Sequence, residues 1–141
     1  KKDSAFAAAT SLSDLSGAVI TGQLNTFHYT VIDQIPGVTK AAAMETFPAM
    51  IVALQSGAVD GYIAERPGAI ADTTANPDLT YVLFPEGQGF EASEDARSIS
   101  VGMAKGSPLL SDVNAILATL DNDTRDQMMN DAILRQPLNA N

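Results

Sequence analysis

Short apolar runs alternate with segments of helical period over residues 18–84, and this alternation constrains the fold most. The apolar runs lie at 17–23, 38–42, 59–64 and 79–84. In the segment between the first two, Phe27, Val31 and Ile35 follow the spacing of one helix face. Because parallel strands need a crossover of about a dozen residues, usually a helix, the pattern predicts an α/β fold with a mostly parallel sheet flanked by helices.

Residues typical of helix starts and ends delimit the helix predicted within 44–57. Thr46 can cap its start, Pro48 suits its first turn, and Gly57 can supply the left-handed residue that ends it. A further helix is predicted from Pro67 to about Thr74.

The alternation of apolar runs with helical segments stops after residue 84. Residues 85–98 are polar and lack a clear period, which predicts a loop. Beyond it we expect a strand at 99–105, a helix from Ser107 to Leu120, and a last helix opened by a capping box of Thr124 and Gln127 and ended by Gln136-Pro137.

Charge and composition exclude several function classes. Of 141 residues, eight are Lys or Arg and seventeen are Asp or Glu, which leaves a formal net charge of −9. Nucleic acids and anionic membrane surfaces select for basic proteins, so neither is expected as a partner. The chain has no cysteine and one histidine. Without a nucleophile elbow, a phosphate-binding glycine loop or a ligand cluster, we predict no enzyme, no metal and no cofactor.

The turn at 21–29, "TGQLNTFHY", joins a predicted strand to a helix. The backbone N–H groups from Asn25 to His28 should be free there, at the positive end of the helix, where a carboxylate or phosphate can bind. The hydroxyl of Thr26 can add a further hydrogen bond. The alternative is that Asn25 or Thr26 is simply the N-cap, and that His28 is a polar residue of the first turn.

Glu65 ends the third predicted strand, at the same sheet edge as that turn. A carboxylate beside an anion-binding helix end suits a zwitterion, whose ammonium group Glu65 would hold. The alternatives are a local arrangement with Arg66, or an acid that caps the helix beginning at Pro67. Asp60, earlier in the same strand, is expected to have a structural role.

Three collinear stretches carry a resemblance to a known family. They are "DLSGAVITGQLNTFH", "LQSGAVDGYIAERPGA" and "SVGMAKGSPLLSDVNAIL". In this order and spacing, over about residues 12–120, the chain resembles the polar amino-acid substrate-binding proteins of ABC importers (bacterial extracellular solute-binding protein family 3). The resemblance implies a type II periplasmic-binding-protein-like fold, a two-lobed clamp that closes on one amino acid.

By this resemblance the turn would hold the ligand's α-carboxylate and Glu65 its ammonium group. The implied ligand-binding residues are Gln23, Asn25, Thr26, Phe27, His28, Ala64 and Glu65. The chain departs from the family pattern at two of them. Asn25 stands where glycine is usual, and Glu65 replaces the usual aspartate, which lengthens its reach by one methylene.

The resemblance also implies which part of the chain forms each lobe. Residues 1–98 would form the second lobe with its hinge segments, and 99–141 would return into the first lobe, whose other half would precede Lys1. We therefore expect a fragment that self-associates through the incomplete lobe. The implied partners are a free amino acid and an ABC-transporter permease, outside the cytoplasm, as a surface lipoprotein, a permease-fused domain or a periplasmic protein. The alternative function is the ligand-sensing effector domain of a transcriptional regulator.

Overall fold

The computed structural model describes residues 1–85 and 87–135, and the chain divides into two units. The first unit comprises Lys1–Ala96 and the second Arg97–Asn141. The division falls close to the predicted boundary at residue 98. The assignment of these units to the lobes of a clamp stays a prediction.

The first unit is built on a sheet of three parallel strands. These are β1 (Val19–Gly22), β2 (Thr39–Lys40) and β3 (Gly61–Ile63), in the order β2-β1-β3. Both strand pairs are parallel, and Ile20 of β1 faces Lys40 on one side and Gly61 on the other. A small open parallel sheet with helical crossovers confirms the predicted α/β class.

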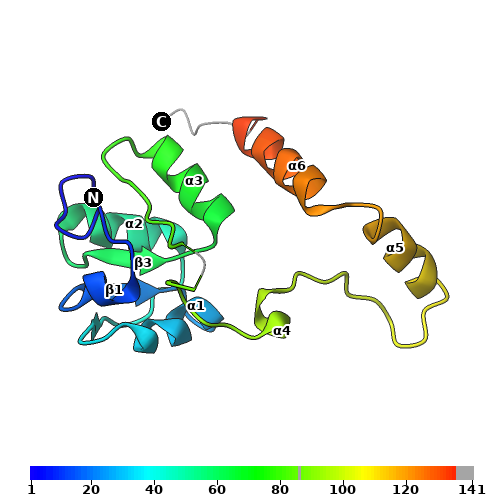
Figure 1. The fold of residues 1–141 in the computed structure, drawn as a ribbon, viewed down its shortest axis with the longest axis horizontal. Helices are drawn as coiled ribbons and strands as arrows, with labels where there is room; N and C mark the ends of the chain where they lie inside the picture. Colours follow the sequence, from blue (N-terminus) through cyan, green and yellow to red (C-terminus); the bar gives the residue numbers. More distant parts are fainter. Residues whose placement is uncertain (86, 136–141) are drawn as a thin grey trace. The chain divides into compact units, whose positions relative to one another are not determined.

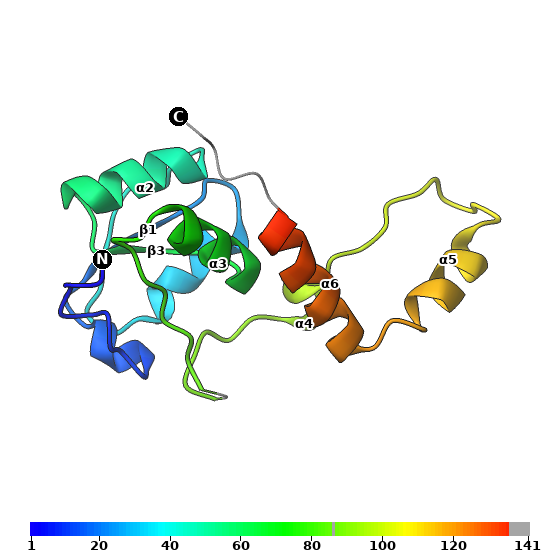
Figure 2. The same cartoon turned by 90° about the horizontal axis from the view of Figure 1, so that it is seen from above.

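Helices cover both faces of this sheet (Figures 1 and 2). In chain order they are η1 (Leu12–Leu15), α1 (Phe27–Thr30), η2 (Val31–Gln34), α2 (Phe47–Ser56) and α3 (Arg66–Ala75), where η denotes a 3₁₀ helix. The core is divided accordingly. Ile20 belongs to a buried cluster with Ile32 of η2, whereas the adjacent Val19 packs on a second cluster around Leu54 of α2. Alternate residues of β1 therefore serve opposite faces.

Asp60 ties the starts of β1 and β3 together. Its backbone N–H donates to the carbonyl of Val19 at 2.7 Å, and its Oδ2 accepts from the N–H of Val19 at 2.8 Å. These two hydrogen bonds give Asp60 the structural role that was predicted for it.

The ends of α2 confirm their sequence signals. The Oγ1 atom of Thr46 accepts from the N–H of Ala49 at 3.3 Å, and Pro48 lies in the first turn. Gly57 adopts φ 78° and its N–H reaches the last helical carbonyls. The third predicted helix is also present as α3.

Two predictions for the first unit are wrong. Residues 79–84 form no strand, because no segment pairs with them. The helix predicted within 24–37 is divided into α1 and η2, each of one turn. Three consecutive β-branched residues, Thr30, Val31 and Ile32, lie where α1 gives way to η2, and such side chains lower helix propensity.

The second unit contains helices α5 (Leu110–Leu117) and α6 (Asn122–Arg135), and α4 (Glu94–Arg97) crosses the boundary between the units. The loop predicted at 85–98 therefore includes one helical turn. The strand predicted at 99–105 is absent, since no neighbouring strand pairs with it. Among the described residues of this unit no side chain is buried.

Both helices of the second unit begin elsewhere than predicted. α5 is shorter than the predicted 107–120, because Ser107 forms a turn in which its Oγ accepts from the N–H of Leu109 at 3.3 Å. α6 begins before the predicted capping box. Asp121 caps it, accepting from the N–H of Thr124 at 2.8 Å. The predicted end at Gln136-Pro137 lies outside the described residues.

Candidate functional site

The carboxyl ends of β1 and β3 lie side by side. Gly22 at the end of β1 pairs with Ile63 at the end of β3, so the chain segments that follow both strands start from the same sheet edge. One segment is the turn leading to α1, and the other contains Ala64 and Glu65. The structure thus brings the two predicted halves of the site to one edge.

Local geometry explains the residues of the turn. A Cβ on Gly22 would lie 3.0 Å from the Cα of Tyr29, so only glycine permits α1 to approach the strand this closely. Asn25 has φ 61°, the only positive φ of a non-glycine residue in the described chain. Asparagine tolerates this left-handed region better than most residues, which accounts for its presence at this turn.

The turn leaves a row of backbone donors. The Oγ1 of Thr26 donates to the carbonyl of Gln23 at 2.8 Å and closes the turn, and it caps no backbone N–H. The N–H groups of residues 25–28 donate to no other group in the described part of the chain. Thr26 occupies the N-cap position without side-chain capping, so these donors stay free. The one-turn length of α1 makes its dipole small, and the donors themselves are the feature that matters.

His28 is the most unusual side chain of this edge. Its side chain is 12% exposed, and both ring nitrogens are buried without a hydrogen-bond partner. The ring of Phe27 lies 4.2 Å from it, centroid to centroid. Burial lowers the pKa of His28, and the nearby carboxylate of Glu65 raises it by less. The imidazole is therefore neutral at pH 7, with one donor and one acceptor nitrogen unused.

Glu65 faces this ring from the neighbouring segment. Its Oε1 lies 3.8 Å from Nε2 of His28, which is too long for a hydrogen bond and, with a neutral ring, is no ion pair. Neither alternative interpretation of Glu65 holds. It occupies the N-cap position of α3 without a side-chain capping bond, and no ion pair joins it to Arg66 within the described chain. Its side chain is 55% exposed and its carboxylate stays available.

The remaining predicted residues have different surroundings. Nε2 of Gln23 donates to the carbonyl of Glu45 at 3.2 Å, so this side chain braces the turn. The ring of Phe27 contacts that of His28 at an interplanar angle of 36°. Ala64 lines a cavity that neither the turn nor Glu65 reaches. The structure thus gathers His28, Glu65 and the turn amides at one edge, and Ala64, next to Glu65 in the chain, also lines the cavity.

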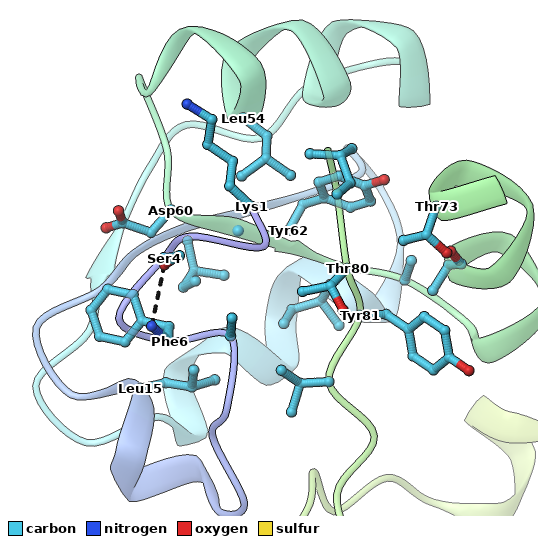
Figure 3. Close-up of a pocket in the computed structure, with 18 of the residues that line it drawn as sticks. Lys1, Ser4, Phe6, Leu15, Leu54, Asp60, Tyr62, Thr73, Thr80 and Tyr81 are labelled. Carbon is cyan, nitrogen blue, oxygen red and sulfur yellow. Dashed lines mark hydrogen bonds between the residues drawn. The ribbon is translucent and has the colours of Figure 1, made fainter. Parts of the chain in front are cut away.

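The cavity lies along β3 in the first unit and has a volume of about 270 Å³ (Figure 3). Leu15, Ile20, Leu54 and Leu79 contribute to its largely apolar lining, and Lys1 and Asp60 are its charged members. Tyr62 stands on its wall and donates from Oη to Oδ2 of Asp72 at 2.7 Å. Burial, followed by this bond, raises the pKa of Tyr62 far above its ordinary value. The sequence carried no signal for this cavity, since it arises where an expected strand pairing fails.

Sequence reasoning also missed the pairing of His28 with Glu65. The signal was available in the parallel topology, which places both after neighbouring strand ends, but the approach of the two side chains depends on tertiary packing. In the described ranges no three His, Asp or Glu side chains gather as a metal site. No described helix is both long and apolar enough to cross a membrane.

Comparison with protein-family models, curated proteins and solved structures finds no match to this chain.

Proposed function

We propose that the chain captures an amino acid at the edge formed by the ends of β1 and β3, as the extracytoplasmic substrate-binding component of an ABC importer. The observation that carries the proposal is the meeting, at one sheet edge, of free backbone donors, the unpartnered His28 ring and the available carboxylate of Glu65. The resemblance to the polar amino-acid binding proteins supplies the class of protein.

The site offers complementary groups to a zwitterion. The N–H groups of residues 25–28 would donate to the α-carboxylate, and Glu65 would accept from the ammonium group. The two unused nitrogens of His28 add one donor and one acceptor between them. Because both nitrogens are buried, a ligand would have to displace the atoms that cover them in order to hydrogen-bond to the ring, and it would then recover the cost of about 1–3 kcal/mol of an unpartnered buried polar group. The proposed role is binding without chemistry.

In this proposal the first unit is the second lobe of a type II binding protein. Ligand contacts to both lobes would favour the closed clamp, and closure would signal to the permease. The protein would act at the cell surface as a lipoprotein, as a permease-fused domain or in the periplasm. The exposed apolar side chains of the second unit, such as Leu110 at 52% and Ile116 at 64%, support self-association through that part of the chain.

A thermal-shift screen of the chain against the twenty amino acids tests the proposal. A ligand at a hundredfold its dissociation constant should stabilise the folded state by about 2.7 kcal/mol, a shift of several degrees. Glu65→Gln removes the acceptor for the ammonium group and should abolish the shift. Glu91→Gln, at another exposed glutamate of the same unit, is the matched control and should retain it.

Two results would contradict the proposal. One is a screen in which no amino acid shifts the transition. The other is a shift that survives Glu65→Gln unchanged, which would place binding elsewhere. Stabilisation by other small metabolites with no response to amino acids would favour the effector domain of a regulator instead.

A further inference from the structure

Ala64 and Glu65 form the connection between β3 and α3. In the described chain the pairing of β3 with β1 ends at Ile63, so no strand partner fixes the residues that follow. The carbonyl of Glu65 instead accepts from the N–H of Ala69 at 3.0 Å, within the first turn of α3. The backbone of Glu65 therefore moves with α3, and the position of the helix decides where its carboxylate lies.

Apolar packing does little to fix α3. None of its residues is buried, and none belongs to either apolar cluster of the first unit. Within the described ranges, two side-chain hydrogen bonds join the helix or its C-cap residue to other elements. One links the exposed side chains of Asn76, the C-cap, and Gln55 of α2 at 3.3 Å. The other links Asp72 of α3 to Tyr62 of β3 at 2.7 Å and is partly buried.

The donor of the second hydrogen bond is held in place by its surroundings. The side chain of Tyr62 extends from β3 toward α3, the helix that carries Thr73 (Figure 3). Its ring lies 6.2 Å from the ring of Phe47, centroid to centroid, in an edge-to-face arrangement. Burial and the bond to the carboxylate of Asp72 raise the pKa of Tyr62, so the phenol keeps its proton and stays a donor.

We propose that Tyr62 and Asp72 are positioning residues, whose hydrogen bond holds α3 against β3 and thereby holds the Glu65 carboxylate at the candidate site. The bond joins residues ten positions apart and closes a loop that contains Glu65. Asp72 follows Glu65 by about two helical turns, so both lie on the same side of the helix. The inference rests on the proposed function, because it concerns the group proposed to accept from the ligand's ammonium group.

His28 reports the position of Glu65 without any ligand. It is the only histidine of the chain, so its imidazole resonances in an NMR titration are unambiguous. Within the described chain Glu65 is the charged group that acts on the pKa of His28, and it raises that pKa against the larger effect of burial. Movement of the carboxylate away from the ring therefore lowers the pKa of His28 toward its value in Glu65→Gln.

The test titrates four variants of the full chain. Tyr62→Phe removes the donor and keeps the ring, and Asp72→Ala removes the acceptor. Asp72→Asn removes the same charge as Asp72→Ala but keeps an oxygen that can accept the hydrogen bond. Tyr81→Phe removes the hydroxyl of an exposed tyrosine in the same unit and is the matched control.

We expect Tyr62→Phe and Asp72→Ala to lower the pKa of His28 toward the value in the variant without the carboxylate. Asp72→Asn and Tyr81→Phe should leave that pKa near its wild-type value. The double variant Tyr62→Phe/Asp72→Ala should lower it no further than either change alone, because both changes remove the same bond. For an amino acid that the thermal-shift screen identifies, Tyr62→Phe and Asp72→Ala should each weaken binding about threefold to tenfold.

A pKa of His28 that is unchanged in both Tyr62→Phe and Asp72→Ala would overturn the proposal, even if both variants unfold more easily. An equal shift in Tyr81→Phe would also overturn it, as would a shift in Asp72→Asn that matches that of Asp72→Ala. An amino-acid affinity that neither variant changes would overturn it as well. If no amino acid binds, the proposed function fails by itself, and the ligand-free titration still decides whether Tyr62 positions Glu65.

Discussion

The two units contain helices with similar sequence signals but very different surroundings. Ile32, in the first unit, is completely buried, whereas Ile116, on the apolar face of α5 in the second, is 64% exposed. The first unit has a parallel sheet whose two faces need covering, and its helices supply that cover. The second unit has no sheet among its described residues. An amphipathic pattern thus predicts a helix and its apolar face, but the covering of that face depends on a partner element.

Truncation of one isoleucine in each unit tests this contrast with the largest effect. Ile32→Ala should lower the free energy of unfolding by about 2–5 kcal/mol, because it leaves a cavity in a closed cluster. Ile116→Ala should change it by less than about 0.5 kcal/mol. Far-UV circular dichroism during urea unfolding measures both, because helices of both units contribute to that signal. Equal losses would break the contrast and mean that the α5 face is buried in solution.

Removal of one helix cap in each unit gives a smaller difference. Thr46→Ala should cost about 1 kcal/mol in the same unfolding measurement, because α2 is packed on the sheet and its cap contributes to the whole unit. Asp121→Ala should leave that measurement unchanged. It should instead loosen the first turn of α6, seen as chemical-shift changes confined to residues near 122–126.

Acid provides an independent check on the α6 cap. The Thr124 side chain and backbone N–H lower the pKa of Asp121 because both stabilise its carboxylate. Because the pKa is lowered in the capped state, the cap contributes its full stability at pH values above 3.8. The start of α6 should loosen as the pH falls below 3.8 and the carboxylate becomes protonated. Loosening already at neutral pH would contradict this cap.

The smallest effect concerns His28, the only histidine of the chain. Burial lowers its pKa below 6.5, so the folded state binds its proton less readily than the unfolded state. The neutral His28 ring therefore contributes its full stability to the first unit above pH 6.5. This contribution is lost as the pH falls through the lowered pKa. Glu65→Gln should lower this pKa further in an NMR titration, and Glu91→Gln should not. A pKa of 6.5 or above in the wild-type chain would contradict the buried, neutral ring.

The sequence predicted best where the determinants are local. The ends of α2 follow from Thr46, Pro48 and Gly57, whose effects reach one helical turn. The parallel class follows from the alternation of apolar runs with crossover segments. The same reasoning is wrong for 79–84 and 99–105, because a strand exists only when another segment pairs with it, and no local composition supplies that partner.

The candidate site was partly predictable for the same reason. Parallel topology placed Glu65 and the turn before α1 at one edge, and the free N–H groups of residues 25–28 agree with the strand-turn-helix expectation. The burial of the His28 ring and its approach to Glu65 were not predictable. They depend on tertiary packing.

The pair of hydrogen bonds between Asp60 and Val19 has a consequence for how this edge is assembled. It joins residues 41 positions apart and closes a loop that contains β2, α1 and α2. A one-residue slip between β1 and β3 would break it and turn alternate side chains to the wrong face. His28 and Glu65 meet at the far end of the same two strands, so they come together only after this long loop has closed in the correct register. Ligand binding at that edge would therefore require completed folding of the whole first unit. A partly folded chain would show no binding.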